Sequence, residues 1–282
     1  MLLPLLLISL LVPRIVPDQV PPAHGFRIHK VSARVFVLER LGLGRANSVL
    51  VVGDESAMLV DAQISPAAGT ALMAAVRGLT TLPVRTLVLT HWHVDHAHGA
   101  AGVAAANPNI TVLAHERSVA AMPVEGTAQL ARARDFWEGQ RSQSASRLAA
   151  GDSDPDGTLA AMAGDTGVLS EMAAPAWIVP ARVAGERTID LGGLEARLIP
   201  MAAHTEGDLV VFLATERIVI GGDVFVPGQP VPPSAPAARA ASLAALLELD
   251  FAILVPGHGG RVPREQIRPR TVSPVQPRAK VQ

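Results

Sequence analysis

Short apolar runs that end in glycine, proline, asparagine or aspartate repeat along most of this 282-residue chain. Runs of about four to eight aliphatic residues bounded by such turn residues are typical of largely buried β-strands. Two pairs of neighbouring runs are joined by Gly53-Asp54-Glu55 and by Gly192-Gly193, which predicts two hairpins. The predicted strands are residues 34–39, 47–52, 57–61, 84–90, 110–114, 186–190, 194–199, 209–214, 217–220 and 251–255.

Alanine-rich segments between these strands predict helices. The first begins at Pro66 and is followed by Gly78, the usual order of proline at the start of a helix and glycine after its end. The stretch 124–174 is less regular, and its position in the chain suggests a cover over a site. The predicted helices are residues 66–77, 99–106, 127–141 and 235–249.

The length and the 49% hydrophobic content suit one large domain. Residues 1–12 are apolar but shorter than the about 20 residues of a membrane-spanning helix, so no stable membrane span is expected. Their length matches a secretory signal, although no Lys or Arg precedes them and no A-x-A-like site follows. A buried N-terminal strand and a mis-assigned start codon are the alternatives. We therefore divide the chain into a signal or linker segment (1–25), one domain (26–260) and an Arg/Pro-rich irregular tail (261–282).

The amino-acid composition excludes several classes of binding site. The net charge is -1, from 24 basic and 25 acidic side chains, which is not a nucleic-acid footprint and favours a small-molecule substrate. The chain has no cysteine, so disulfides and thiolate ligands are both excluded, and any metal must be held by His, Asp or Glu. The protein is expected to be periplasmic or secreted if residues 1–12 are a signal and cytoplasmic otherwise, and the sequence specifies no oligomeric state.

Residues that could bind a metal are most concentrated in the loop from Thr90 to Gly99, directly after a predicted buried strand. This loop holds four of the nine histidines and one aspartate, in the pattern H-x-H-x-D-H. Imidazole nitrogen and carboxylate oxygen are the usual ligands of zinc and of non-haem iron. Because a loop bends freely while the preceding strand is rigid, such closely spaced residues can converge on one metal or face two. The loop therefore predicts a metal site.

Three later strands also end in a histidine or aspartate beside glycine: His204, Asp223 and His258. Each alone is best explained as a turn residue, but three of them together with the histidine loop favour a metal site. Asp61, which closes an earlier strand, is either a turn or cap residue or a carboxylate that orients a metal-binding imidazole. His115 is interpreted as an ordinary loop histidine rather than a wall of the site.

On these residues the chain resembles the metallo-β-lactamase-fold hydrolase superfamily. The resemblance extends from about residue 30 to 260 and keeps the order and approximate spacing of the family's motifs. It implies an α/β fold, a four-layer αββα sandwich of two mixed sheets with helices outside and metals at one edge. The order of strands and helices predicted above is compatible with this fold but does not establish it. The matching segments are Asp61, Thr90 to His96, Ala203 to Asp208, Gly221-Gly222-Asp223 and Pro256 to Gly259.

The resemblance also implies roles for individual residues. His98 stands where many relatives have glycine, and we interpret it as a wall residue rather than an additional ligand. The tail after His258 stands where relatives often carry a closing helix. The implied roles are His91, His93 and His204 on the first metal, Asp95, His96 and His258 on the second, Asp223 between them, and Asp61 as the orienting carboxylate.

Two zinc ions are the expected cofactors, with iron or manganese as alternatives. Two such metals share a water and lower its pKa towards about 7, so that a metal-bound hydroxide can attack a carbonyl carbon. Asp95 is the expected catalytic residue, because a carboxylate beside that water can pass its proton. This predicts a metal-dependent hydrolase of a small ester, lactone or lactam, similar to β-lactamases.

Substrate preference is less sharply indicated. Asp223 stands where many true β-lactamases have cysteine, as it does in glyoxalase-II-like, lactonase-like and sulfatase-like members. The absence of a helical C-terminal extension disfavours a glutathione thioesterase, and the absence of tyrosine departs from many lactonases. The alternatives are an iron-dependent oxidoreductase of the same fold acting on sulfur or oxygen substrates, and a non-catalytic metal-binding protein.

Overall fold

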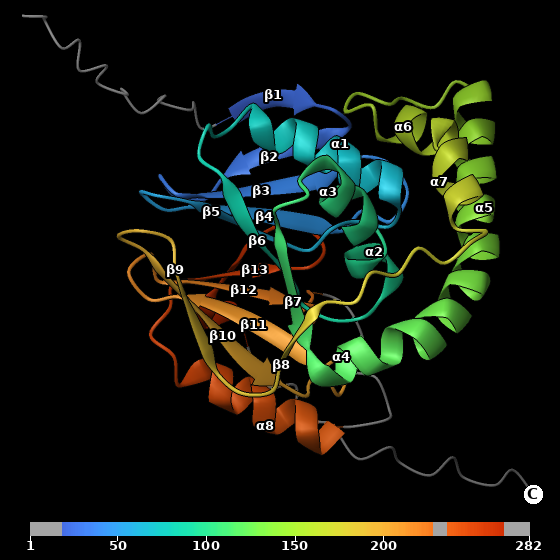
Figure 1. The fold of residues 1–282 in the computed structure, drawn as a ribbon. Coiled ribbons are helices and arrows are strands. Elements are labelled where there is room, and N and C mark those ends of the chain that lie inside the picture. The colour runs from blue at the N-terminus through green and yellow to red at the C-terminus, as the bar shows by residue number, and fades with distance from the viewer. Residues whose placement is uncertain (1–18, 228–235, 268–282) are drawn as a thin grey trace, which may run out of the picture.

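The computed structural model describes residues 19–227 and 236–267. Two β-sheets stack face to face, and helices lie on the outer side of each (Figure 1). The four-layer αββα sandwich of mixed sheets is thus confirmed. Within the described ranges, none of the helices combines the length and hydrophobicity that a membrane crossing requires. The apolar segment 1–12 lies outside the described residues.

The first sheet has eight strands in sequence order. Strands β1 to β5 pair antiparallel, and β5 to β8 pair parallel. Parallel neighbours need a crossover, which α1 and α3 provide on the outer face. The elements are β1 (Gln19–Ala23), β2 (Phe26–Lys30), β3 (Val35–Arg40), β4 (Asn47–Val52), β5 (Ala57–Val60), α1 (Pro66–Arg77), β6 (Val84–Leu89), α2 (Val94–Ala97), α3 (Ala100–Ala106), β7 (Thr111–His115) and β8 (Ala181–Val183).

The second sheet has six strands in the order β14-β13-β12-β11-β10-β9. Only β12 and β13 pair parallel, and α8 connects them across the outer face. The other pairs are antiparallel, including the predicted hairpin of β9 and β10. The elements are β9 (Arg187–Asp190), β10 (Glu195–Met201), β11 (Asp208–Leu213), β12 (Ile218–Gly222), α8 (Pro236–Leu247), β13 (Ile253–Pro256), β14 (Val262–Pro263) and the 3-10 turn η2 (Arg264–Gln266).

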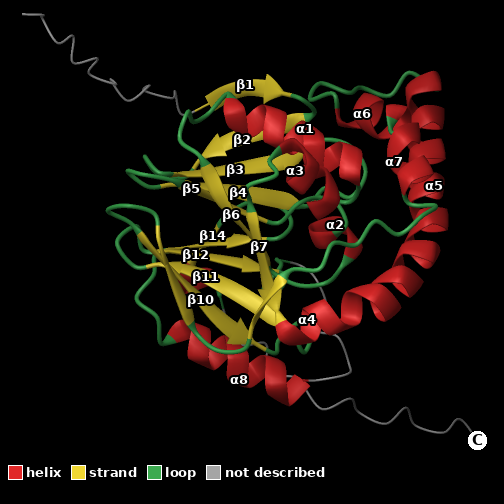
Figure 2. Cartoon of the chain, viewed as in Figure 1, coloured by secondary structure: helices red, strands yellow, loops and turns green. Residues whose placement is uncertain are grey.

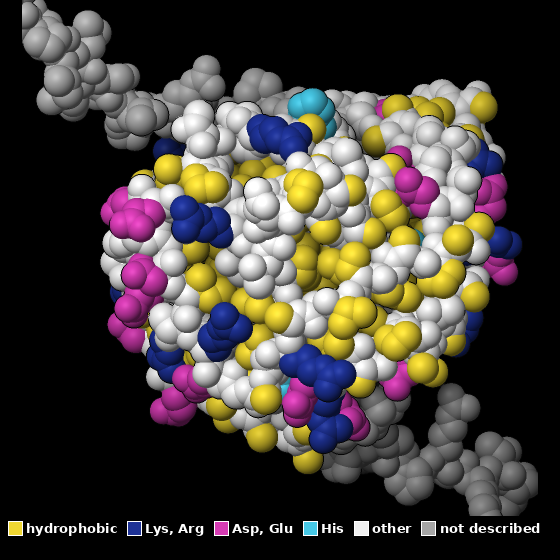
Figure 3. Space-filling view, in the orientation of Figure 1, with side chains coloured by type: hydrophobic (Ala, Val, Ile, Leu, Met, Phe, Trp, Pro, Cys, Tyr) yellow, Lys and Arg dark blue, Asp and Glu magenta, His cyan; other side chains and the backbone are white. Residues whose placement is uncertain are grey.

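The strands are apolar on both faces because both faces are covered. In β4, Val49 and Val51 enter the core between the two sheets, whereas Leu50 enters the core beneath α1 and α3. This follows from the alternation of side chains along a strand. A third apolar cluster lies beneath α8 and contains Leu246 and Phe251. The surface seen in Figure 3 carries basic and acidic side chains interspersed around its rim, without a single basic patch.

A helical segment between β7 and β8 forms one side of the molecule, where the long α5 passes beyond α2 (Figure 2). It packs against the rest of the molecule through a fourth apolar cluster, in which Leu130 of α5 joins Leu43 and Val94. A salt bridge of 2.7 Å between Arg40 and Asp165 also ties it to the first sheet. Its elements are α4 (Glu116–Ala121), the π-helical turn η1 (Met122–Gly126), α5 (Thr127–Ala149), α6 (Thr158–Gly164) and α7 (Thr166–Glu171).

The structure differs from the sequence predictions at three places. Residues 19–23, expected in a linker, form β1, which pairs with β2. The tail begins with β14 and η2 rather than irregular chain, because Val262 and Ile267 are buried in the apolar cluster beneath α8. The helix predicted at 127–141 continues to Ala149. In each case pairing or packing with a distant segment decides the outcome.

Candidate metal centre

The histidine loop leaves the carboxyl end of β6 and turns into the short helix α2 (Figure 1). His91 lies one residue beyond Thr90, which follows the strand, and it is buried, with 1% of its surface exposed. His93 precedes α2 as its N-cap residue, while Asp95 and His96 lie within the helix. A bend of this kind lets four side chains from six consecutive positions face one point.

The second sheet brings three more side chains to the same edge. His204 lies between β10 and β11, Asp223 follows β12, and His258 follows β13. The structure therefore brings together all seven residues predicted as ligands. Their donor atoms form three groups, and within each group the atoms lie within 4.8 Å of one another. The groups are His91, His93 and His204; His91, His96 and Asp223; and Asp95, His96 and His258.

Short distances join these groups into one cluster. His204 Nε2 lies 2.9 Å from His93 Nδ1. His258 Nε2 lies 3.2 Å from His96 Nε2 and also 3.2 Å from Asp95 Oδ2. Oδ2 of Asp223 lies 3.7 Å from the Nε2 atoms of both His204 and His258. Asp223 is therefore located between the histidines that the two sets contribute.

Asp61 fixes the histidine loop by hydrogen bonds, as expected of a carboxylate that orients a metal-binding imidazole. Its Oδ2 accepts a hydrogen bond of 2.8 Å from His96 Nδ1, which leaves Nε2 of that ring directed at the cluster. The amide and hydroxyl of Thr90 donate to the same carboxylate, at 2.7 Å and 2.8 Å. The Thr90 oxygen then accepts from His91 Nδ1 at 3.0 Å. One carboxylate thus fixes two imidazoles.

Asp61 has φ of 61°, a left-handed backbone conformation that non-glycine residues adopt rarely. Aspartate tolerates it better than most residues because its short side chain can hydrogen-bond locally. The conformation turns the chain sharply after β5 and places the carboxylate beneath the loop.

Asp208 has an equivalent role in the second sheet, although the sequence analysis assigned it none. Its carboxylate accepts hydrogen bonds from the amides of Ala203, His204 and Thr205 and from the Thr205 hydroxyl, at 2.6–3.1 Å. Burial raises the pKa of Asp208, and these hydrogen bonds counteract the rise. The carboxylate holds the turn that carries His204. An aspartate four residues after a candidate ligand was the signal that could have revealed it.

The loop that carries His258 is fixed by Asn47, which the sequence analysis also missed. The Asn47 side-chain amide donates to the carbonyls of Pro256 and Gly259, both at 2.9 Å. Its backbone amide donates to the Gly257 carbonyl at 2.7 Å. A β-carbon on Gly257 would overlap Asp223 Oδ1 and lie 2.7 Å from His96 Cε1, so glycine is required there. This close approach explains the Pro-Gly-His-Gly motif.

Charge differs sharply across the cluster. Burial lowers the pKa of both His93 and His204 to about 4, and burial with the neighbouring histidines lowers that of His91 strongly. These three rings are neutral at pH 7 and present nitrogen lone pairs. Burial also disfavours charge on His96, but Asp95, Asp223 and Asp61 outweigh it and raise the pKa to about 10.

Burial alone would raise the pKa of Asp95, but the charges of His96 and His258 hold it well below its usual range. The carboxylate is therefore ionised at neutral pH. Together with Asp223, the Asp95 carboxylate makes the part of the cluster around His96 and His258 favour a positive charge.

The residues present fit a bound metal. His91 Nε2 and Asp223 Oδ1 are buried, and neither has a hydrogen-bond partner. Buried polar atoms are normally paired, so two orphaned atoms in a cluster of nitrogen and oxygen donors indicate a missing partner. A divalent cation would satisfy both atoms, since imidazole and carboxylate are its ordinary ligands.

Two other histidines near the cluster have structural roles. His98 is fully buried; its Nδ1 lies 2.9 Å from the Ile64 carbonyl, and its Nε2 accepts from the Ala176 amide at 3.1 Å. Both ring nitrogens are used, so His98 joins the segment before β8 to the histidine loop instead of lining the site. His115 accepts from the Arg117 amide at 3.3 Å as the N-cap of α4.

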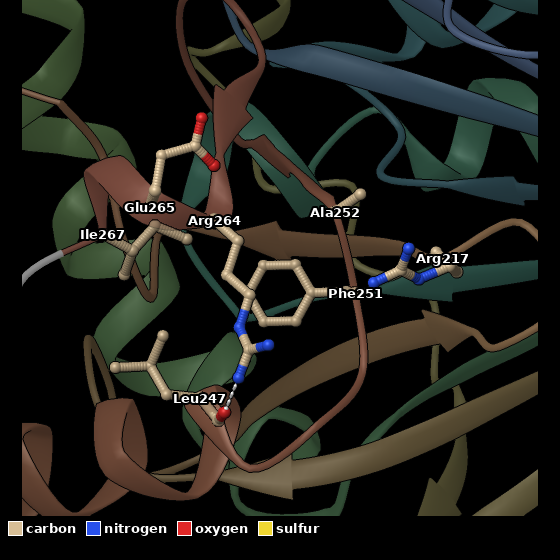
Figure 4. Close-up of a pocket in the computed structure, with 7 residues that line it drawn as sticks. All are labelled: Arg217, Leu247, Phe251, Ala252, Arg264, Glu265 and Ile267. Atoms are coloured by element: carbon tan, nitrogen blue, oxygen red, sulfur yellow. Dashed lines mark hydrogen bonds between the residues drawn. The ribbon is translucent and has the colours of Figure 1, made fainter.

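A cavity of about 450 Å³ opens beside His93 and His204. Trp92 gives it an apolar wall, and Arg117 and Glu206 line it as an exposed ion pair of 2.9 Å. Another cavity, of about 520 Å³, contains none of the predicted site residues (Figure 4). In that cavity Arg264 stacks over Phe251 and donates to the Leu247 carbonyl, which is the packing of an ordinary surface hollow.

Comparisons with known proteins agree with this geometry. Residues 41–258 match the sequence model of the family described as the metallo-beta-lactamase superfamily. No curated protein matches the chain.

Three solved structures resemble the chain over most of its length. A metallo-beta-lactamase from Pontibacter korlensis has a TM-score of 0.56 at 17% identity, covering 85% of this chain and 94% of that one. One from Erythrobacter litoralis, crystallised with beta mercaptoethanol in the active site, has a TM-score of 0.58 at 21% identity, covering 88% and 95%. A metallo-beta-lactamase family protein from Thermus thermophilus has a TM-score of 0.57 at 18% identity, covering 83% and 76%. At such identities the likeness shows the fold.

Proposed function

The chain belongs to the metallo-beta-lactamase superfamily, and from that premise we propose that it is a zinc-dependent hydrolase of a small ester, lactone or lactam. The observation that carries the proposal is the presence of two adjoining donor sets with Asp223 between them. A single ion would use only one of these sets. Two sets with one carboxylate between them would suit two ions, as in two-metal hydrolases.

The residues divide between the two ions as the resemblance implies. His91, His93 and His204 would hold the first ion as neutral imidazoles. Asp95, His96 and His258 would hold the second, and Asp223 would contact both. Asp61 would not touch either ion, because its oxygens accept from Thr90 and His96.

When bound, two zinc ions supply an activated water and polarise the carbonyl of the substrate. Asp95 contributes the proton transfer. It is ionised at neutral pH, and it lies at the cluster itself, 3.2 Å from His258 Nε2. Its carboxylate can accept the proton of the attacking water and pass it to the leaving group.

The cavity beside His93 and His204 supports a substrate of small size. Its volume of about 450 Å³ is within the usual range for small-molecule sites. Trp92 can pack against an apolar part of the substrate while the carbonyl approaches the cluster. The start of the helical segment borders this cavity through Glu125, and Gln129 accepts from the Val94 amide at 2.9 Å.

The test is a substrate panel with zinc-loaded protein: a chromogenic cephalosporin, aryl esters, lactones of several chain lengths, thioesters and sulfate esters. We expect hydrolysis of at least one ester, lactone or lactam, its loss with chelator and its return with zinc. Metal analysis of the same sample should give close to two ions per chain. If nothing on the panel is hydrolysed while an iron-loaded sample consumes oxygen with a thiol or persulfide, the protein is an oxidoreductase instead.

A further inference from the structure

The loop of residues 41–46, between β3 and β4, holds one ring nitrogen of His258. His258 Nδ1 lies 3.3 Å from the Arg45 carbonyl, while Nε2 of the same ring lies 3.2 Å from Asp95 Oδ2. Ala46 and His258 also form an isolated antiparallel bridge. A carbonyl beside one nitrogen of a ligand imidazole fixes which nitrogen carries the proton and where the ring points. The position of the Arg45 carbonyl therefore decides how His258 presents Nε2 to a metal.

The backbone of this loop has an unusual conformation just before His258 is reached. Gly44 has φ of 89° and Arg45 has φ of 46°. Glycine adopts the left-handed region readily, whereas a residue with a long side chain does so only where the surrounding structure holds it there. The preceding residue, Leu43, is fully buried in the fourth apolar cluster. The conformation at Arg45 thus depends on how Leu43 is fixed.

The carboxylate of Asp165, which lies between α6 and α7 of the helical segment, fixes Leu43. Its Oδ2 accepts a hydrogen bond from the Leu43 amide at 2.7 Å and another from Arg40 Nη2, also at 2.7 Å. Arg40 Nε in turn donates to the Leu43 carbonyl at 2.9 Å. One ion pair therefore binds both the amide and the carbonyl of Leu43.

This ion pair is shielded from water and closely fitted to the loop. The side chains of Arg40 and Asp165 are only 8% and 20% exposed. Hydrogen bonds to charged groups strengthen away from water, so the pair is a firm tie. A β-carbon on Gly42 would overlap Asp165 Oδ2, so glycine is required for the carboxylate to reach the Leu43 amide. The loop is thus shaped around a carboxylate from a distant part of the chain.

We propose that Asp165 is a positioning residue for His258, on which it acts through the loop of residues 41–46. The carboxylate fixes Leu43, and Leu43 fixes the turn that places the Arg45 carbonyl beside His258 Nδ1. This inference rests on the two-metal centre of the proposed function. It makes the metal affinity of the set of Asp95, His96 and His258 depend on a residue of the helical segment. His204, by contrast, is held by Asp208, so the three-histidine set should not depend on Asp165.

The first test measures the zinc affinity of each set separately. The variant His204→Ala isolates the set that contains Asp95, and His258→Ala isolates the three-histidine set. Adding Asp165→Ala to His204→Ala should weaken zinc binding by about 10- to 100-fold, the usual effect of changing a residue that orients a ligand. Adding it to His258→Ala should leave zinc binding unchanged. Competition with a fluorescent chelator gives both affinities. Losses of similar size in both variants, a loss confined to the three-histidine set, or no loss in either would overturn the proposal.

Two further variants separate positioning from loss of a buried charge. Asp165→Asn keeps an oxygen that can accept from the Leu43 amide, so it should recover most of the affinity lost in Asp165→Ala. Gly42→Ala keeps both charges but places a β-carbon against Asp165 Oδ2, so it should weaken zinc binding to the same set. Because both positions share one contact, Gly42→Ala combined with Asp165→Ala should lose no more affinity than Asp165→Ala alone. Additive losses would show that Asp165 does not act through this loop.

Glu171→Ala is the matched control. Glu171 ends α7 in the same helical segment, and its carboxylate accepts from the Ala67 amide of α1 at 2.8 Å. Its removal loosens the segment without changing a contact of the loop of residues 41–46, so both zinc affinities should be unchanged. If Glu171→Ala weakens the set of His258 as much as Asp165→Ala does, docking of the whole segment is responsible and the assignment to Asp165 is wrong.

Chelator competition needs no turnover, so it separates failure of this inference from failure of the proposed function. A selective loss of affinity in Asp165→Ala supports the positioning role even if nothing on the substrate panel is hydrolysed. Two zinc ions in the natural protein, with unchanged affinities in Asp165→Ala, would contradict this inference alone. Natural protein that never binds a second ion would contradict both. Where hydrolysis is found, Asp165→Ala should lose it at limiting zinc and regain it at saturating zinc, because no group that touches the substrate is changed.

Discussion

The set of His91, His93 and His204 and the set of Asp95, His96 and His258 adjoin each other, yet they differ in charge. The three-histidine set has no carboxylate of its own, and the pKa values of His93 and His204 are about 4. The other set contains an ionised aspartate, and the pKa of His96 is about 10. The first set is therefore neutral at pH 7, with one unprotonated nitrogen on each imidazole ring, whereas His96 of the second set carries an additional proton that a metal must displace.

The difference has a structural cause. Desolvation dominates at His93 and His204, which face one another, so their charged forms are disfavoured. His96 is also buried, but it lies between Asp61 on one side and Asp95 and Asp223 on the other. The same burial thus accompanies opposite pKa shifts, and the arrangement of carboxylates decides which one results. We expect the two sets to differ in catalysis, metal retention and pH dependence.

The largest effect is expected from Asp95→Asn. The change keeps the size of the side chain and one oxygen donor but removes its basicity, so turnover should fall by roughly 10²- to 10⁴-fold. Initial rates on the best substrate of the panel would measure it, with metal content determined on the same sample. Asp135→Asn, an exposed aspartate of α5, is the control and should leave turnover unchanged. Turnover within a factor of a few of the natural protein would remove Asp95 from the proton transfer.

Replacing one ligand of either set should remove one of the two metal ions. His204→Ala should lose mainly the ion of the three-histidine set, and His258→Ala mainly the ion of the set that contains Asp95. Elemental analysis should show a fall from close to two ions per chain to close to one in each variant. His29→Ala, a change in an exposed side chain of β2, should retain both ions. Natural protein that never exceeds one ion under careful loading would contradict the two-metal arrangement.

Asp61→Asn and Asp208→Asn compare the supports of the two sets. Asp61 fixes His96 and His91, so its replacement should weaken metal binding by about 10- to 100-fold, the typical effect of changing a residue that orients a ligand. Asp208 holds only the turn of His204, so its effect should lie at the lower end of that range. Competition with a fluorescent chelator would give both affinities. A larger loss in Asp208→Asn than in Asp61→Asn would reverse the comparison.

The smallest effect is the change in metal affinity for a single pH unit. The pKa of His96 is raised to about 10, so below that pH a proton competes with a metal on the set of Asp95, His96 and His258. Raising the pH should therefore strengthen binding there, by at most about tenfold per pH unit for one displaced proton. With pKa values of about 4, His93 and His204 are already neutral at pH 6, and their set should show little dependence on pH above that point.

Calorimetry in buffers of different ionisation enthalpy would count the protons released by each ion. His258→Ala isolates the three-histidine set, and His204→Ala isolates the other. Equal proton release in the two variants would show that the two sets do not differ in protonation.

The sequence by itself determined most of the strands, the helices at 66–77 and 99–106, and the seven side chains that meet at the edge of the sheets. These features depend on local pattern: apolar runs bounded by turn residues, and donor residues placed where strands end. The resemblance, carried by the histidine loop together with Asp61 and the segments around His204, Asp223 and His258, added the stacking of two mixed sheets, which local pattern cannot specify.

Only the tertiary structure decided how the remaining residues act. Local pattern did not reveal the pairing of β1 with β2 or the hydrogen bonds of Asn47 to the loop of His258. Nor did it reveal that both ring nitrogens of His98 form hydrogen bonds to backbone groups. Asp165 looks like any aspartate between two short helices, and its contact with the loop of residues 41–46 follows from the way the helical segment packs against the rest of the molecule. Burial and charge depend on what packs around a residue in three dimensions, and for Asn47, His98 and Asp165 the neighbours come from distant parts of the sequence.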